Sequence, residues 1–123
     1  MVVEDESMLL RAICKKLKMN GISTISATKG SQALDYLKSL PDLPDAIWLD
    51  YYLNEMNGLV FMGKLKKDPK LANIPVFVIS NSASPEKVHQ MLALGVKKYI
   101  LKADHRLDEL ISIIKGFILK KEK

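Results

Sequence analysis

Short apolar runs and longer amphipathic segments alternate along the 123 residues, and this alternation constrains the fold more than any other feature. The β-branched stretch 22–27 and the continuous apolar runs 46–49 and 75–79 are typical of strands. The segments between them repeat apolar residues at helical spacing, and glycine or proline follows several of them. Strict alternation of this kind predicts an α/β fold, in which helices cover both faces of a parallel sheet.

The predicted elements are five strands and five helices. We expect strands at residues 1–3, 22–27, 46–49, 75–79 and 98–101. Four helices are expected at residues 6–20, 28–40, 57–67 and 104–121, and another opens at Ser84-Pro85 and closes at Gly95, with Ser84 as its N-cap. The first strand is short, so we expect further residues before Met1 in the natural chain.

The length predicts a single domain, residues 1–123, without room for a second. No run of 18 apolar residues occurs, which argues against a membrane span, and the acidic start does not resemble a secretory signal. The only cysteine, Cys14, excludes an intrachain disulfide and favours a cytoplasmic location.

The net charge of +5 raises the question of a nucleic-acid partner. The lysines are scattered, however, and only the tail, residues 120–123, is locally dense in them. No aromatic residues alternate with the basic ones, as they do in single-strand binders. The charge is therefore interpreted as a solvated surface, which argues against direct nucleic-acid binding.

Polar residues follow four of the predicted strands. Glu4 and Asp5 follow the first strand, Asp50 the third, Ser80 the fourth and Lys102 the fifth. Ligands of open α/β sheets bind beyond the carboxyl ends of the strands, so these side chains are expected at one edge of the sheet.

Carboxylates packed together repel one another unless a cation neutralises them, and a hard divalent ion such as Mg²⁺ suits oxygen ligands. A carboxylate can also attack phosphorus, and phosphoryl transfer depends mainly on positioning and charge neutralisation. A lysine and a hydroxyl group can bind the phosphoryl oxygens. The set therefore indicates a Mg²⁺-dependent phosphoryl site.

Each residue taken alone has a simpler interpretation. Asp5 can cap the first helix, Ser80 can bond to its local backbone, and Lys102 can be a solvated surface lysine. Because these residues follow successive strands at the same end of the sheet, a shared site is favoured over three separate local roles.

Four segments of the chain carry recognisable motifs in a fixed order: Val2–Glu6, Ile47–Asp50 with Met56–Leu59, Pro75–Ser80 and Gly95–Lys102. Together they resemble the motifs of one family, the receiver domains of bacterial response regulators, and the resemblance covers essentially the whole chain. The resemblance implies a flavodoxin-like, doubly wound sheet of five parallel strands in the order 2-1-3-4-5.

The resemblance also implies a role for each site residue. Asp50 would take a phosphoryl group from a phosphohistidine of a sensor histidine kinase or phosphotransfer protein. Asp5, Asp50 and the backbone carbonyl of Tyr52 would hold Mg²⁺, with Glu4 acting through water. Ser80 and Lys102 would bind the phosphoryl oxygens.

Signalling would follow from a change of shape, with no enzymatic activity beyond self-phosphorylation from a donor and slow self-dephosphorylation. Tyr99 would swing inward when Ser80 moves toward the phosphoryl group. The face made by the fourth helix, fifth strand and fifth helix would then change its preference for a downstream protein or output domain.

The chain departs from the family pattern at four positions. Ala103 follows Lys102 where the family usually has a proline after a cis peptide bond, so we expect a trans bond or a strained cis bond, and a shifted loop. Asn54 replaces a frequent proline, and Asn81 stands where a small residue is common. Tyr52 is large at a position that influences access of water to the acyl phosphate, so we expect slow self-dephosphorylation.

Three rival classes are weighed against a phosphorylated switch. The departures leave open a pseudo-receiver that acts only as an interaction scaffold. A hydrolase with an aspartyl nucleophile would carry a second acid two residues after it, where Tyr52 stands. A flavin carrier would need a phosphate-binding loop after the first strand, where Glu4 and Asp5 would repel the phosphate.

Overall fold

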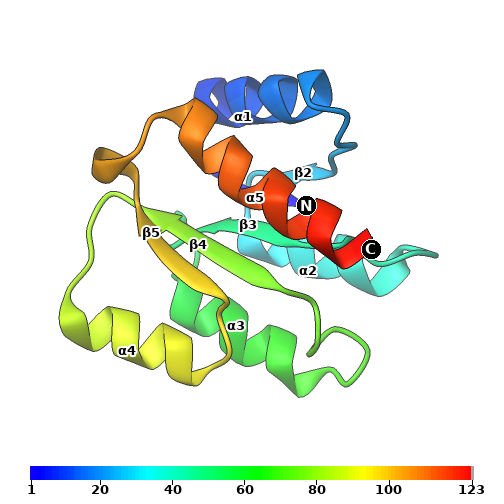
Figure 1. Ribbon diagram of the computed structural model, residues 1–123. Helices are drawn as coiled ribbons and strands as arrows, with labels where there is room; N and C mark the ends of the chain where they lie inside the picture. The colour runs from blue at the N-terminus through cyan, green and yellow to red at the C-terminus, as the bar shows by residue number, and fades with distance from the viewer. Residues whose placement is uncertain (123) are drawn as a thin grey trace.

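The computed structural model describes residues 1–122, and these residues fold around one parallel sheet with the strand order β2-β1-β3-β4-β5 (Figure 1). The strands are β1 (Val2–Val3), β2 (Ser26–Ala27), β3 (Ile47–Asp50), β4 (Val76–Ser80) and β5 (Lys98–Leu101). The helices are α1 (Ser7–Met19), α2 (Gly30–Ser39), α3 (Gly58–Lys67), α4 (Pro85–Ala93) and α5 (Leu107–Glu122). The predicted fold class and strand order are confirmed. Lys123, which is the last residue of the predicted domain and of its basic tail, lies outside the described residues.

Most predicted boundaries differ from the observed ones by at most two residues, and two boundaries were wrong by more than that. The second strand was expected at residues 22–27, but β2 contains only Ser26 and Ala27, which pair with Val2 and Val3. Because β1 is itself two residues long, no residue of β1 lies opposite residues 22–24.

The last helix was expected from Asp104 but begins at Leu107. A 3₁₀ turn, η1 (Lys102–Asp104), comes first. The Glu109 carboxylate then accepts a hydrogen bond from the Arg106 backbone N–H at 3.0 Å, which is half of a capping box and fixes the start of α5.

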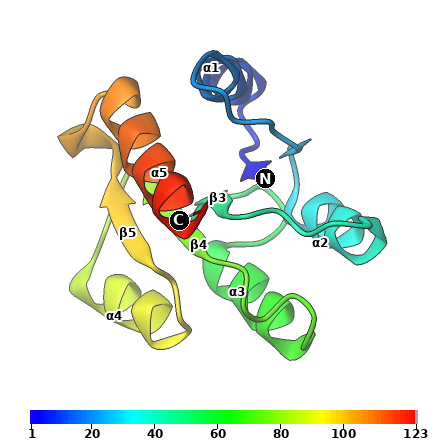
Figure 2. The same ribbon diagram turned by 45° about the vertical axis from the view of Figure 1, so that its right-hand side comes forward.

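Two apolar cores lie on opposite faces of the sheet. Helices α1 and α5 cover one face, and α2, α3 and α4 cover the other (Figures 1 and 2). Successive strand residues alternate between the cores: Trp48 packs in the core under α1 and α5, whereas Ile47 and Leu49 pack in the other. The strands are therefore apolar along their whole length, which is the pattern that predicted a sheet covered on both faces.

Side-chain caps fix the start of the two helices that follow β3 and β4. The Asn57 side chain accepts a hydrogen bond from the Val60 N–H at 2.9 Å at the start of α3. Ser84 does the same for the Lys87 N–H at 3.2 Å, which confirms the predicted N-cap of α4. Gly95 ends the α4 segment with a φ of +96°, a conformation that favours glycine.

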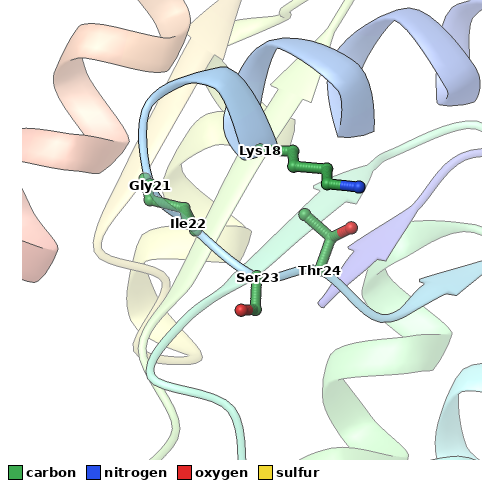
Figure 3. Close-up of a pocket in the computed structure, with 5 residues that line it drawn as sticks. All are labelled: Lys18, Gly21, Ile22, Ser23 and Thr24. Atoms are coloured by element: carbon green, nitrogen blue, oxygen red, sulfur yellow. The ribbon is translucent and has the colours of Figure 1, made fainter.

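The amino end of the sheet carries an open hollow beside the connection from α1 to β2. Lys18, Gly21, Ile22, Ser23 and Thr24 line it (Figure 3). None of these residues is acidic, so the hollow contributes nothing to a cation site. Among the described residues, no helix is both long and apolar enough to cross a membrane.

Candidate functional site

Three carboxylates meet at the carboxyl end of the sheet. Glu4 and Asp5 directly follow β1, and Asp50 is the last residue of β3. Val3 pairs with Leu49 in the parallel ladder, so the residues that follow them emerge side by side. One oxygen from each of the three carboxylates lies within 4.8 Å of the other two. Glu4 and Asp50 are buried and Asp5 is partly buried, so the three acids form a partly enclosed cluster.

Lys102 reaches this cluster from the end of β5. Its Nζ lies 3.0 Å from Glu4 Oε1 and 3.5 Å from Asp50 Oδ2. The Lys102 side chain is only 17% exposed, and that of Glu4 is 1% exposed. Among the described residues no peptide bond is cis, so the Lys102–Ala103 bond is trans, one of the two alternatives expected.

Burial and the charges of neighbouring groups shift the pKa values of the three acids. Burial and the neighbouring Glu4 raise the pKa of Asp50 from 3.8 to about 7, although Lys102 opposes the shift. Burial and Glu4 also raise the pKa of Asp5. For Glu4, burial works against the charged form, but hydrogen bonds from Lys102 and the Glu6 N–H lower its pKa. The cluster therefore favours binding of a further positive charge.

Ser80 ends β4, the strand between Asp50 and Lys102 in the sheet. Its side chain is fully buried, and its Oγ accepts a weak hydrogen bond from the Ser82 N–H at 3.4 Å. Tyr99 lies on β5 and is partly buried, and its hydroxyl donates to the Ser82 backbone carbonyl at 2.8 Å. The predicted switch residues Ser80 and Tyr99 are thus both linked to Ser82, while the exposed Asn81 lies between the two serines.

Tyr52 lies against the phosphoacceptor candidate. Its backbone N–H donates to Asp50 Oδ1 at 3.3 Å, and it forms an antiparallel bridge with Asn57 that closes the loop after β3. The Tyr52 hydroxyl accepts hydrogen bonds from Ser82 Oγ, at 3.0 Å, and from Lys87 Nζ. Its side chain is 44% exposed, at the surface of the site.

Sequence patterns assigned no role to Ser82 or Lys87. Lys87 is 35 residues from Tyr52 along the chain, and no local pattern links the two. The only usable signal was the predicted N-cap at Ser84, which places Lys87 in the first turn of α4, near the same edge of the sheet.

The family model described as response regulator receiver domain matches residues 1–115 of the chain. The two-component response regulator ORR8 of Oryza sativa subsp. indica is 33% identical over 102 residues, which covers 83% of this chain and 84% of that protein. The sensor histidine kinase CheAY of Helicobacter pylori is 32% identical over 99 residues, which covers 80% of this chain but 12% of that protein.

Solved structures agree with the sequence matches. The phosphorylated cyanobacterial phytochrome response regulator RcpA superposes with a TM-score of 0.79 at 30% identity, over 94% of this chain and 87% of that chain. Similarity thus extends along nearly the whole chain in both sequence and fold.

Proposed function

The chain belongs to the response regulator receiver domain family, and from this membership we propose that Asp50 accepts a phosphoryl group in a Mg²⁺-assisted reaction. Receiver domains of this family are signalling proteins rather than classical enzymes, and response regulators interact with histidine kinases or phosphotransfer proteins. The cognate donor of this chain would be one of these two protein classes. We also propose that residues 1–123 act as a single receiver domain in the cytoplasm.

The observation that carries the proposal is the cluster of Glu4, Asp5 and Asp50 with Lys102 beside it. Three carboxylates against one ammonium leave two net negative charges when all are ionised, which a divalent cation would balance. Mg²⁺ fits this set because it prefers oxygen ligands and needs few carboxylates. Asp5, Asp50 and the Tyr52 carbonyl would hold the ion, with Glu4 acting through a water molecule.

When bound, the ion would neutralise negative charge on the carboxylates and on the phosphoryl oxygens. The Asp50 carboxylate oxygen would form the new bond to phosphorus while the phosphorus–nitrogen bond of the donor phosphohistidine breaks. The freed imidazole keeps the electron pair of that bond. The Lys102 ammonium and the Ser80 hydroxyl would hold the other phosphoryl oxygens, since charge-assisted hydrogen bonds are strong and directional.

The new charge would then change the surface formed by α4, β5 and α5. Ser80 and Tyr99 both contact Ser82, so movement of the Ser80 hydroxyl toward the phosphoryl group would disturb the Tyr99 hydrogen bond. Release of that bond would free Tyr99 to turn inward. A local charge event of this kind biases an element with two arrangements, and a downstream protein or output domain would recognise one of them.

The test is phosphorylation by a small donor. The protein is incubated with acetyl phosphate and Mg²⁺, and intact-mass spectrometry is expected to detect one added phosphoryl group that is lost in Asp50→Asn. Asp45→Asn is the matched control, because Asp45 is an exposed aspartate before β3, at the other end of the strand. An unmodified wild-type mass, or equal labelling of Asp50→Asn, would contradict the proposal.

Beryllofluoride tests the alternative, a pseudo-receiver that is not phosphorylated, which the family match does not favour. A phosphorylatable domain is expected to bind beryllofluoride at Asp50 only with Mg²⁺ present. Absence of binding, together with an unmodified mass, would favour the scaffold interpretation.

A further inference from the structure

Lys87 occupies a position where helix stability does not favour a lysine. It is the third residue of α4, and the positive end of the helix dipole disfavours a cation in the first turn. Its side chain is partly buried against the rest of the protein, while the contact that its ammonium makes is exposed. Interactions outside the helix must therefore account for its placement.

Those interactions are with two tyrosines of the loop after β3. The Lys87 ammonium donates a hydrogen bond to the Tyr52 hydroxyl and lies 5.4 Å from the centre of the Tyr51 ring. The second distance is within the range of a cation–π interaction. Side chains in a helix point toward its N-terminus, so the cap at Ser84 directs Lys87 back toward the edge of the sheet.

Tyr52 depends on these contacts for its position. Its side chain is 44% exposed, so core packing alone does not fix it, although its ring packs edge-on to Tyr51 at 4.9 Å. Its hydroxyl accepts hydrogen bonds from Lys87 and from Ser82. The side chain therefore crosses from the loop that follows Asp50 to the loop that follows Ser80.

We propose that Lys87 is a positioning residue that holds the Tyr52 ring across the mouth of the site and so protects the phosphoryl group on Asp50 from water. The inference rests on the proposed function. Hydrolysis of the acyl phosphate needs a water molecule to approach phosphorus opposite the Asp50 oxygen, and a ring fixed across the entrance limits that approach. Because Lys87 belongs to α4, the position of this helix then sets the lifetime of the phosphorylated state.

The experiment measures the half-life of phosphorylated protein after removal of acetyl phosphate, with Mg²⁺ present. Lys87→Met removes the hydrogen bond and keeps the length of the side chain, and we expect a half-life about 3- to 10-fold shorter. Lys87→Arg keeps a donor and a cation, so it is expected to restore most of the lifetime. Lys97→Met, which removes an exposed lysine outside α4, is the control and is expected to leave the half-life unchanged.

A double-mutant cycle separates positioning from a general structural role. Tyr52→Phe removes the hydroxyl that accepts the Lys87 hydrogen bond but keeps the ring, whose centre lies 4.7 Å from the Lys87 ammonium. Adding Lys87→Met to Tyr52→Phe is therefore expected to shorten the half-life by less than Lys87→Met does in the wild type. An unchanged half-life in Lys87→Met, or an equal loss in the Tyr52→Phe background, would overturn the inference. Failure of the wild type to become phosphorylated would instead overturn the proposed function, so the two failures are distinguishable.

Discussion

At the carboxyl end of the sheet, oxygens from three carboxylates lie within 4.8 Å of one another with a lysine beside them. At the amino end, an open hollow is lined by Lys18 and by the uncharged residues 21–24 (Figure 3). Both ends are built from connections between the same strands and helices. They differ because all strands of a parallel sheet point the same way, so the residues that follow each strand gather at one end only.

The comparison indicates that position in the topology, rather than the presence of a hollow, predicts where polar side chains gather. An open surface without converging polar groups offers a ligand little binding energy. Substitutions of the same type at the two ends are therefore expected to have unequal effects.

The largest difference is expected between two lysines. Lys102→Met leaves the buried Glu4 without its ion-pair partner, so the free energy of unfolding without Mg²⁺ is expected to fall by about 2–4 kcal/mol at neutral pH. The rate of phosphorylation by acetyl phosphate is expected to fall by about 100-fold or more, since Lys102 would no longer stabilise the transferring group. Urea denaturation and intact-mass kinetics measure the two effects; a stability equal to wild type would contradict the ion pair.

The next largest effect concerns the pH dependence of stability. With a pKa of about 7 in the folded protein against an ordinary value of 3.8, Asp50 binds a proton that the unfolded chain has released. The free energy of unfolding is therefore expected to increase as the pH falls through about 7 toward about 4, and to decrease as the pH rises through the same window.

Asp50→Asn removes this titration. Without Mg²⁺, the variant is expected to be more stable than wild type by about 1–3 kcal/mol at pH 8 and similar to it at pH 4. Urea denaturation across this pH range provides the measurement, and Asp45→Asn serves as the exposed control. The same difference between Asp50→Asn and wild type at both pH values would be inconsistent with a raised pKa.

A smaller effect is expected on Mg²⁺ affinity. Asp5→Asn removes one proposed oxygen ligand and is expected to weaken Mg²⁺ binding about tenfold, whereas Asp45→Asn leaves it unchanged. Calorimetric titrations at pH 7 in buffers of different ionisation enthalpy are also expected to detect release of a fraction of a proton, because Asp50 must ionise to bind the metal. Binding without proton release would argue against Asp50 as a ligand.

The smallest effects are expected at the amino end. Lys18→Met and Thr24→Val change the lining of the hollow, and each is expected to alter the free energy of unfolding by less than about 0.5 kcal/mol. Phosphorylation and Mg²⁺ binding are expected to match wild type. A marked loss of either activity would show that the two ends are coupled through the sheet.

The fold was predictable because its main signals are local. Runs such as 75–79 are apolar throughout, and the parallel topology then determines which residues share an edge. The boundaries that failed depended on distant partners. The extent of β2 is limited by the length of β1, and the start of α5 depends on a hydrogen bond from Arg106 to Glu109 after the 3₁₀ turn.

The clustering of the candidate site residues was predictable for the same reason, but only in part. Glu4, Asp5, Asp50 and Lys102 each directly follow or end a strand, so topology alone brings them together. Lys87 lies within a helix, and its contact with Tyr52 depends on the direction in which α4 leaves the sheet. Residue spacing along the chain carries no information about that direction.

The Lys102 ammonium already has an anionic partner, because Glu4 lies 3.0 Å away. Under the proposed function, an incoming phosphoryl group would compete with Glu4 for the same ammonium, and Glu4, at 1% exposure, has almost no solvent to replace it. A divalent cation beside the Glu4 carboxylate would offset that loss. The ion pair would then impose an order of loading, in which the domain reacts poorly with phosphoryl donors until divalent metal is bound.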